Sequence, residues 1–507
     1  MAGSRKPFPL PRLLLLLLPA AASSAAPAAA PPPPPQPPPL SFVVDSSGAP
    51  IATVDAGFLS WTLDAGALCE PQPSTLDFFS PLVQRRLAAL RPFFLRVGGT
   101  LADRQQLAGA GIAPQPEPPD MGIASCDFAQ ATWDALAGIA AGTGADLIVG
   151  FDGLLRDAGA RGAWNPRNAA LLLAQAARRH PQLWGAEIGN EPGLWAGICP
   201  QCNISAVVHA ADFAALRAAA AAAFAGSGVA PPLVLGPDVT CIGAGQGCGA
   251  LDNAAYLAAL LAAAPDLDVV TWHLYSFLNY SEIYSRSAFD TMVADVGLVV
   301  AALRASPAAG RPLWVGEGGP HWRLPQPLAS NLSAEFAFAS MLGALGRAGV
   351  KVLARQTLYT LLHADGGGAP AFWFALLFKR LMGAEVLGVS GPGANESAAD
   401  VRVFAHRGGA GCAAPPCVAA LVLNAGDAPA SVAIELRGGA PCGGARAEYA
   451  FAPGADTPAG EATAEVNGAA PQFAPGSSEL PQIEAVARGC DEAVVVANRS
   501  LTFLVLN

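Results

Sequence analysis

The sequence has 507 residues, more than one hydrophobic core usually holds, so we expect two or more domains. Apolar residues make up 52% of it, which excludes a mainly disordered chain. The 29 basic and 39 acidic residues give a net charge of −10, which argues against nucleic acid or another polyanion as a partner.

The first 40 residues have the pattern of a targeting segment and a spacer. Basic residues precede the apolar run Leu13–Leu18, and small residues follow it through Ala30, which is typical of a secretory signal peptide. A membrane anchor is the alternative, but the run is short for a span unless the alanines extend it. We assign residues 1–30 to a signal peptide and the proline-rich residues 31–40 to a stiff spacer.

Cysteines and glycosylation motifs indicate where the protein resides. Ten cysteines fit an oxidising compartment. Motifs that accept N-linked glycans in such a compartment begin at Asn203, Asn279, Asn331, Asn395 and Asn498. We therefore expect a secreted protein, extracellular or in a cell wall, or one in an acidic vacuole- or lysosome-like compartment. Membrane association is compatible with these features but is not required.

The cysteine spacing allows two interpretations. Cys199-Pro-Gln-Cys202 has the C-x-x-C spacing of redox and zinc sites, but no second C-x-x-C and no paired histidine lies near it. We therefore favour a structural disulfide there. The pairs Cys241–Cys248 and Cys412–Cys417 are further candidates, because each flanks a loop that contains glycine or proline. We expect no metal site and no cofactor.

Residues 56–385 alternate between apolar runs and helical patterns. Each run ends near polar residues, and the runs are Phe58–Leu63, Phe93–Val97, Asp146–Phe151, Trp184–Ile188, Pro232–Leu235, Leu267–Trp272, Leu313–Val315 and Val352–Ala354. Strand–helix alternation predicts a parallel sheet, and eight units predict an α/β fold of the (β/α)8 TIM barrel type. A doubly wound sheet is the alternative, but no Gly-x-Gly-x-x-Gly opens a helix after the first strand.

Two regions that flank the barrel have strand-like patterns. Residues 386–507 contain short apolar runs separated by turns rich in glycine, proline and alanine, which predict a C-terminal β-sandwich domain: Val401–Ala405, Val418–Leu423, Ser431–Leu436, Ala447–Phe451, Ala493–Ala497 and Leu501–Leu506. Residues 41–55 contain two similar runs, Phe42–Val44 and Ile51–Val54. We expect this segment to supply N-terminal strands to the same sandwich.

Two glutamates follow strands of the predicted barrel. Glu191 lies just past the fourth run, in the turn Gly189-Asn190-Glu191-Pro192, and Glu317 lies just past the seventh. The carboxyl ends of all strands share one mouth of a barrel, so both side chains are expected there. Hydrolysis of a glycosidic bond needs two convergent carboxylates, one to protonate the leaving oxygen and one to attack or to activate water. Taken alone, the turn at Glu191 is equally well interpreted as the N-cap of the next helix.

Short motifs from about residue 42 to about residue 390 add a family resemblance. In chain order they are Phe58–Asp64, Leu95–Thr100, Trp164–Ala169, Glu187–Pro192, Thr271–Tyr275, Val315–Glu317, Arg355–Leu358 and Leu376–Gly383. Together they resemble glycoside hydrolase family 79, the group of heparanase and the plant heparanase-like β-glucuronidases. None of these motifs is specific alone, and the likeness fades in the sandwich.

The resemblance implies a secreted β-glucuronidase that retains the anomeric configuration and acts on a glucuronide or a proteoglycan-type glycan. Glu191 would be the acid/base and Glu317 the nucleophile. Asn190 matches an amide that contacts the sugar 2-hydroxyl, Tyr275 matches a tyrosine that orients the nucleophile, and His273 matches a neighbour in the same pocket. Three more positions match residues that contact the sugar: Asp64, Thr100 and Gln356.

One element differs from the family. After Arg355–Leu358 the family has a Gly-Asn-Tyr element that contacts the uronate carboxylate, whereas this chain continues with Tyr359-Thr360-Leu361-Leu362. A bound carboxylate needs hydrogen-bond donors, so either another group supplies them or the sugar is neutral. Tyr359, or His363 one helical turn later, is the expected substitute. Packing of Tyr359 under the loop is the equally weighted alternative.

Two other functions remain open at this level. An endo-acting heparanase-type hydrolase would need clusters of lysine and arginine along its cleft to bind sulfated chains, and the barrel loops contain none. A catalytically silent glycan-binding relative would not need to keep both Glu191 and Glu317. We therefore favour an exo-acting β-glucuronidase.

Overall fold

The computed structural model of the protein describes residues 38–506 except for these segments: 70–76, 113–125, 158–161, 181–182, 199–201, 247, 249–251, 278–281, 322–330, 393–399, 412–416, 439–443 and 454–462. The predicted signal peptide and most of the spacer lie outside the described residues. The same holds for Cys199, Cys412, Asn279 and Asn395.

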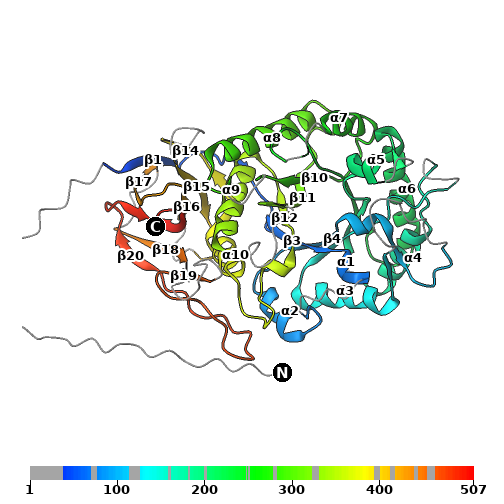
Figure 1. Cartoon of the computed structure of the whole chain (residues 1–507), viewed down its shortest axis with the longest axis horizontal. Helices are drawn as coiled ribbons and strands as arrows, with labels where there is room; N and C mark the ends of the chain where they lie inside the picture. Colours follow the sequence, from blue (N-terminus) through cyan, green and yellow to red (C-terminus); the bar gives the residue numbers. More distant parts are fainter. Residues whose placement is uncertain are drawn as a thin grey trace, which may run out of the picture. The chain divides into compact units, whose positions relative to one another are not determined.

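Eight parallel strands close into a barrel (Figure 1). They are β3 (Leu59–Asp64), β4 (Phe94–Gly98), β7 (Asp146–Phe151), β8 (Leu183–Ile188), β9 (Leu233–Val239), β10 (Val269–Tyr275), β11 (Leu313–Gly319) and β12 (Val352–Arg355). Strands that follow one another in the sequence are neighbours, and β12 closes the barrel on β3 by pairing Leu353 with Leu59. Each predicted apolar run overlaps one of these strands, so the predicted TIM barrel is confirmed.

Helices surround the barrel strands (Figure 1). They are α2 (Pro81–Ala88), α3 (Gln130–Thr143), α4 (Arg167–Arg179), α6 (Ala206–Phe224), α7 (Ala254–Ala263), α8 (Arg286–Arg304), α9 (Leu332–Ala348) and α10 (Pro370–Leu381). Helix α6 is long and apolar enough to cross a membrane, but it packs against α4, α7 and β8 as part of this layer. Short loop elements are α1 (Gly66–Cys69), α5 (Trp195–Ile198), η1 (Thr100–Arg104), η2 (Pro192–Leu194), η6 (Leu358–Thr360), β5 (Gln105–Leu107) and β6 (Cys126–Phe128).

The barrel interior is aromatic in one layer and charged in the next. Phe94 of β4 packs against Trp184 of β8 and Trp314 of β11, with ring centroids 4.7 and 4.6 Å away. Side chains two residues apart on a strand share a face, so Arg96 lies directly after Phe94 toward the carboxyl end of β4. The charged groups at the mouth of the barrel therefore rest on an apolar floor.

A sandwich follows the barrel. Its strands are β13 (Met382–Leu387), β14 (Val389–Ser390), β15 (Val401–Gly408), β16 (Val418–Asn424), β17 (Ala430–Arg437), β18 (Ala445–Pro453), β19 (Ala464–Val466), β20 (Val486–Gly489), β21 (Val494–Val496) and β22 (Ser500–Leu506), together with β1 (Leu40–Asp45) and β2 (Ala52–Thr53). One sheet has the order β14-β1-β17-β21, and the other has the order β19-β18-β22-β16-β15-β13-β2 with β20 beside β18. The N-terminal strands thus join the sandwich, as predicted.

Helices α9 and α10 lie between the barrel and the sandwich (Figure 1). Phe374 and Phe378 of α10 pack against Phe503 of β22, with ring centroids 5.6 and 6.5 Å away. These contacts belong to one hydrophobic core that continues from the barrel into the sandwich.

Disulfides tie down two loops in the described part of the chain. The predicted pair Cys241–Cys248 forms, and Cys69–Cys126 joins α1 to β6. The second pair was missed because its members are 57 residues apart and only folding brings them together. Cys202 and Cys417 are disulfide-bonded too, but the cysteines predicted to pair with them lie outside the described residues.

One of the glycosylation motifs has a structural role. Asn203 and Asn498 are exposed, but Asn331 is buried. The Asn331 side chain accepts a hydrogen bond of 2.9 Å from the backbone N–H of Ala334 and so caps α9. A glycan on Asn331 is incompatible with this buried position in the folded protein.

The strand β1 should contribute strongly to stability. Phe42 is fully buried in the sandwich core. We expect Phe42→Ala to lower the free energy of unfolding by about 3–5 kcal/mol, the usual cost of truncating a buried phenylalanine. Ser41→Ala, at the exposed neighbouring position, should change it by less than about 0.5 kcal/mol. Chemical denaturation measures both, and equal effects would contradict the placement of β1.

Candidate active site

Glu191 occupies a bent segment just past β8. Gly189 and Glu191 both have positive φ values, 76° and 50°, and the second is strained for a residue with a side chain. The backbone N–H of Glu191 donates a 3.1 Å hydrogen bond to the carbonyl of Asp238, which holds the bend. Glu191 precedes η2, but its side chain makes no capping hydrogen bond. The carboxylate is instead turned toward the barrel mouth, where 16% of its surface remains exposed.

Glu317 lies on β11 and is held from two sides. Tyr275 donates a hydrogen bond of 2.5 Å to Oε1, and Arg96 lies 3.1 Å from Oε2. His273 and Tyr275 are two residues apart on β10 and therefore share a face, and His273 pairs in register with Glu317. Because both oxygens have donors, the carboxylate is fixed in orientation.

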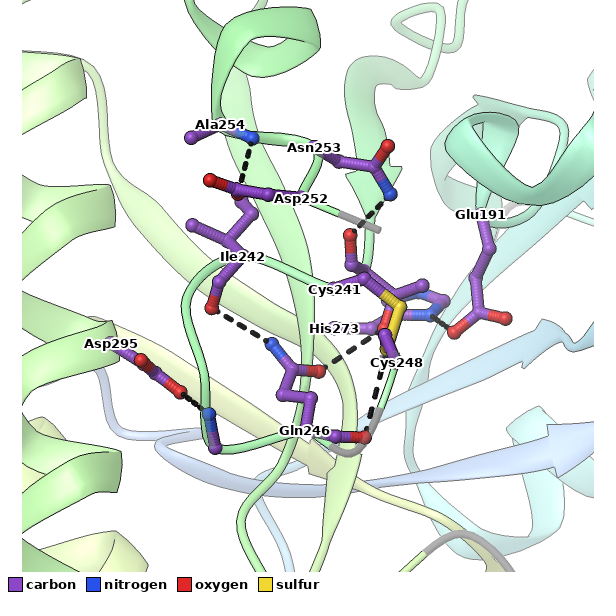
Figure 2. Close-up of a disulfide and its surroundings, with 12 residues drawn as sticks. Glu191, Cys241, Ile242, Gln246, Cys248, Asp252, Asn253, Ala254, His273 and Asp295 are labelled. Atoms are coloured by element: carbon purple, nitrogen blue, oxygen red, sulfur yellow. Dashed lines mark hydrogen bonds and ion pairs between the residues drawn. A yellow bond between two sulfur atoms is a disulfide. The ribbon is translucent and has the colours of Figure 1, made fainter. Parts of the chain in front are cut away.

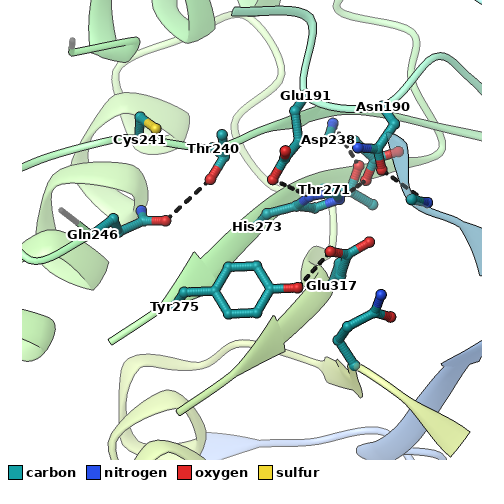
Figure 3. A network of polar contacts seen from close by, with 12 residues as sticks. Asn190, Glu191, Asp238, Thr240, Cys241, Gln246, Thr271, His273, Tyr275 and Glu317 are labelled. Carbon is teal, nitrogen blue, oxygen red and sulfur yellow. Dashed lines mark hydrogen bonds and ion pairs between the residues drawn. The ribbon is translucent and has the colours of Figure 1, made fainter. Parts of the chain in front are cut away.

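Glu191, His273 and Glu317 converge on one point. Each offers one polar side-chain atom, and these three atoms lie within 4.8 Å of one another. Figure 3 shows the three side chains together at the ends of β10 and β11. The two glutamates therefore face each other across the same small space at the barrel mouth.

His273 links Glu191 to a buried aspartate. Its Nδ1 lies 3.0 Å from Glu191 Oε1, and its Nε2 lies 3.3 Å from Asp238 Oδ1. Burial lowers the pKa of His273, but the negative charge of Glu317 and the contacts with Asp238 and Glu191 outweigh it and raise the pKa to about 10. The ring is therefore an imidazolium at neutral pH. To bind a metal ion together with Glu191 and Glu317, the His273 ring would have to lose a proton. It would also have to give up its contact with a carboxylate.

Asn190 is oriented by its surroundings. Its Oδ1 accepts hydrogen bonds from the Gly99 N–H at 3.1 Å and from Arg96 at 3.3 Å, and its backbone N–H donates to Asp103 at 2.8 Å. Asp103 also accepts a hydrogen bond of 2.7 Å from the Trp195 indole. With the oxygen engaged, the amide Nδ2 is the group left to donate to a sugar hydroxyl.

The remaining predicted residues lie around the same mouth. Gln356 donates to Asp64 at 3.3 Å and also contacts Thr62. Burial raises the pKa of Asp64, and the charge of Glu317 adds to this effect. Thr100 begins η1 after β4 and is half-buried, and its side chain makes no hydrogen bond to Glu191 or Glu317 in the described structure.

Tyr359 sits in η6, after the last barrel strand. Its ring packs edge-on against Phe78, with centroids 5.0 Å apart, and it is half-buried. Burial raises the pKa of its hydroxyl, and the charge of Asp64 adds to this, so Tyr359 is a neutral donor. The ring of Tyr359 is therefore partly packed under the loop, as the alternative interpretation predicted. Its hydroxyl is also within electrostatic range of Asp64, a predicted sugar-binding residue.

Four functional neighbours were missed from the sequence: Arg96, Asp103, Glu187 and Asp238. Arg96 is the centre of the group, since it bonds Glu187 at 2.7 Å as well as Glu317 and Asn190. A usable signal existed for two of them, because Arg96 and Glu187 are charged residues inside otherwise apolar strands. Nothing comparable marked Asp103.

The loop after β9 is braced beside the site. Figure 2 shows the Cys241–Cys248 disulfide close to Glu191 and His273. Asn253 donates a hydrogen bond of 2.8 Å from its side chain to the carbonyl of Thr240, next to the disulfide. These bonds fix the carboxyl end of β9, on which Asp238 lies.

A (β/α)8 barrel with two such carboxylates at its mouth defines a glycoside hydrolase. Residues 51–333 match the profile of the glycosyl hydrolase family 79 N-terminal domain. The chain belongs to this family.

The similar proteins agree with this assignment. Heparanase from Mus musculus is 27% identical over 414 residues, which cover 70% of this chain and 73% of the relative. Heparanase-like protein 1 from Arabidopsis thaliana is 26% identical over 355 residues, which cover 65% of this chain and 62% of the relative.

Solved structures with a similar fold include two glycosidases. A 4-O-α-L-rhamnosyl-β-D-glucuronidase from Fusarium oxysporum 12S has a TM-score of 0.64 at 17% identity and covers 92% of this chain and 100% of its own. A family 51 arabinofuranosidase from Xanthomonas axonopodis pv. citri has a TM-score of 0.61 at 16% identity, with coverage of 92% and 99%. These two structures support the fold alone.

The hydrogen bond from Tyr275 to Glu317 should matter for turnover. A bond to a charged group contributes about 1.5–3 kcal/mol, so Tyr275→Phe should lower kcat about 10- to 150-fold on any chromogenic glycoside that the wild type cleaves. Tyr256→Phe is the matched control, because that hydroxyl bonds His209 outside the site. A Tyr275→Phe enzyme as active as the control would contradict the arrangement.

Proposed function

We propose that this glycoside hydrolase is a retaining β-glucuronidase in which Glu317 is the nucleophile and Glu191 the acid/base. The observation that carries the proposal is the short separation between the two carboxylates, whose nearest polar atoms lie within 4.8 Å. This close approach accords with the carboxyl separation of about 5–5.5 Å in retaining enzymes, in which one carboxylate attacks directly.

The surroundings assign the two roles. Glu317 is held as an anion by Tyr275 and Arg96 and therefore attacks the anomeric carbon. Glu191 is more exposed and donates its proton to the leaving oxygen as the glycosidic bond breaks. In the second step Glu191 removes a proton from water, the resulting hydroxyl bonds to the anomeric carbon, and Glu317 leaves as a carboxylate. His273 and Asn190 position Glu191 and the sugar.

Replacing each glutamate should separate the two steps. Glu317→Gln should abolish turnover because the amide cannot form the glycosyl-enzyme. Glu191→Gln should still release an activated aryl leaving group in a burst, since that group needs no proton, and then hydrolyse the intermediate slowly. Stopped-flow absorbance measures the burst, and NMR of the wild-type product should show the retained anomer first.

Glu385→Gln, at a partly exposed position of the sandwich strand β13, is the matched control for these two variants. It should leave turnover unchanged. An inverted product anomer, or full activity in Glu317→Gln, would refute the proposed roles.

The choice of glucuronate rests on the family and on the mouth of the barrel. The relatives named above are a heparanase and a heparanase-like protein. Tyr359 offers a neutral hydroxyl that is subject to the charge of Asp64, a predicted sugar-binding residue. Tyr359 is therefore the donor that we assign to the substrate carboxylate.

Tyr359→Phe should discriminate between acidic and neutral sugars. One lost bond to a carboxylate corresponds to about 1.5–3 kcal/mol, so KM for an aryl glucuronide should rise about 10-fold or more. KM for the matching glucoside should change by less than about 2-fold. If wild type cleaves both substrates equally well, the site does not recognise a carboxylate.

An endo-acting heparanase-type activity is the second candidate, because the heparanase relatives favour it as much as an exo-acting glucuronidase. The two differ in their products: an endo-acting enzyme shortens a glucuronate-containing polysaccharide rapidly, whereas an exo-acting one releases monosaccharide first. Retention of both glutamates with their donors disfavours the silent glycan-binding alternative. Secretion, or residence in an acidic lumen, accords with the disulfides and belongs to the same proposal.

A further inference from the structure

Two carboxyl groups behind the catalytic pair share one cation. Glu187 lies on β8 and Asp238 lies on β9, and both are fully buried. Arg96 Nε bonds Glu187 Oε2 at 2.7 Å, and Arg96 Nη2 lies 3.3 Å from Asp238 Oδ2. Figure 3 shows Asp238 beside His273, on the side away from Tyr275.

The oxygens of this pair have few donors. Within the described structure, Glu187 Oε1 has no hydrogen-bond partner, and the Asp238 oxygens have only ion-pair contacts of 3.3 Å with Arg96 and His273. A buried oxygen left in this way is costly. A hydrogen bond between Glu187 and Asp238, which lie against the same guanidinium, would satisfy one oxygen of each, but it requires a proton on one of them.

The backbone around Asp238 is built to keep its side chain in place. Asp238 has a φ of 55°, which is strained for a non-glycine residue. Its N–H donates to Thr271 Oγ1 at 3.1 Å, and its carbonyl accepts from Glu191. A Cβ at Gly316 would lie 2.6 Å from Asp238 Oδ1, so only glycine leaves room for this carboxylate beside the nucleophile.

We propose that Glu187 and Asp238 share one proton, carried by Glu187, and that this pair positions His273 against Glu191. Glu187 donates to Asp238, and Asp238 stays ionised and holds the His273 imidazolium. His273 in turn holds Glu191. Glu187 and Asp238 are thus positioning residues. The inference rests on the proposed function in one respect only, namely the role of Glu191, at which this series of contacts ends.

The charges around the pair balance if Glu187 is neutral. Arg96 from β4 and His273 from β10 are then two cations. They face two anions, Asp238 from β9 and Glu317 from β11. In the resting site Glu191 is then the one group of these that gives up its proton in the first step of the proposed reaction. Four ionised carboxylates with only two cations in a buried site would be strongly unfavourable.

The acidities of the pair support this distribution. Burial raises the pKa of Glu187 to about 8 because it outweighs the attraction of Arg96, and Asp238 adds to the rise. Burial acts in the same direction on Asp238, but Arg96 and His273 outweigh it and hold the pKa of Asp238 below its ordinary value.

The titration of His273 tests the proposal without any turnover. Glu187 should lose its proton near pH 8, before His273 titrates near pH 10, so the 15N shifts of His273 in the wild type should show a first, smaller step near pH 8 that Glu187→Gln lacks. Asp238→Asn removes a real charge and should lower the His273 pKa by about 1 or more. If wild type and Glu187→Gln show the same single step near pH 10, Glu187 carries no proton at neutral pH and the proposal is overturned.

A second measurement covers the case in which the Asp238 variant does not fold. Glu187 has a pKa of about 8 in the folded protein and an ordinary value of 4.5, so it binds an extra proton on folding. Its contribution to stability is complete below about pH 4.5 and is lost as the pH rises through about 8. The melting temperature of wild type should therefore fall more between pH 5 and pH 8 than that of Glu187→Gln, and the infrared C=O band of a protonated acid should disappear in the variant.

These outcomes separate the inference from the proposed function. Parallel melting curves with no infrared difference would overturn the shared proton even if Glu317→Gln is inactive. If the melting curves and the infrared band show a proton on Glu187 but Glu317→Gln is active, the proposed catalytic roles are refuted. The shared proton of Glu187 and Asp238 is then still supported.

Discussion

The guanidinium of Arg96 is the interaction on which the site depends. Its nitrogens contact Glu187, Glu317, Asp238 and Asn190, and the side chain is 1% exposed. Carboxylates in an apolar interior otherwise take up protons, because burial disfavours their charged form. Arg96 therefore does more than hold the strands together: it places a positive charge 3.1 Å from Glu317, the carboxylate that we propose as the nucleophile, and attracts it. The aromatic floor below strengthens this effect by excluding water.

Much of the fold could be predicted from the sequence because the spacing of apolar residues indicates where strands and helices lie. Each barrel strand is a short apolar run closed by a polar residue, and parallel strands bring all those residues to one mouth. Glu191 and Glu317 were found in this way. The short strands β13, β14, β19 and β20 were not predicted, since they are set by pairing partners far along the chain rather than by their own pattern.

The inner layer of the site was less accessible to prediction. That Arg96 contacts Glu187 and Asp238 depends on the register of β4, β8 and β9 and on the inward direction of each side chain. Sequence spacing indicates which residues end a strand, but it does not indicate which of them meet across the barrel. The strained φ values of Glu191 and Asp238 are likewise visible only in the structure, where one hydrogen bond joins the two residues.

The pairing of β1 with β17 has a consequence for how the chain is made. Ser46, at the end of β1, bonds the carbonyl of Arg437, 391 residues away. At about 5–20 residues per second, a ribosome needs ~20–80 s to pass from one to the other. During that interval the barrel can assemble while β1 waits with open edges for a partner not yet synthesised. The sandwich thus closes only after β17 has been made, and until then β1 is open to wrong strand pairing on the ribosome.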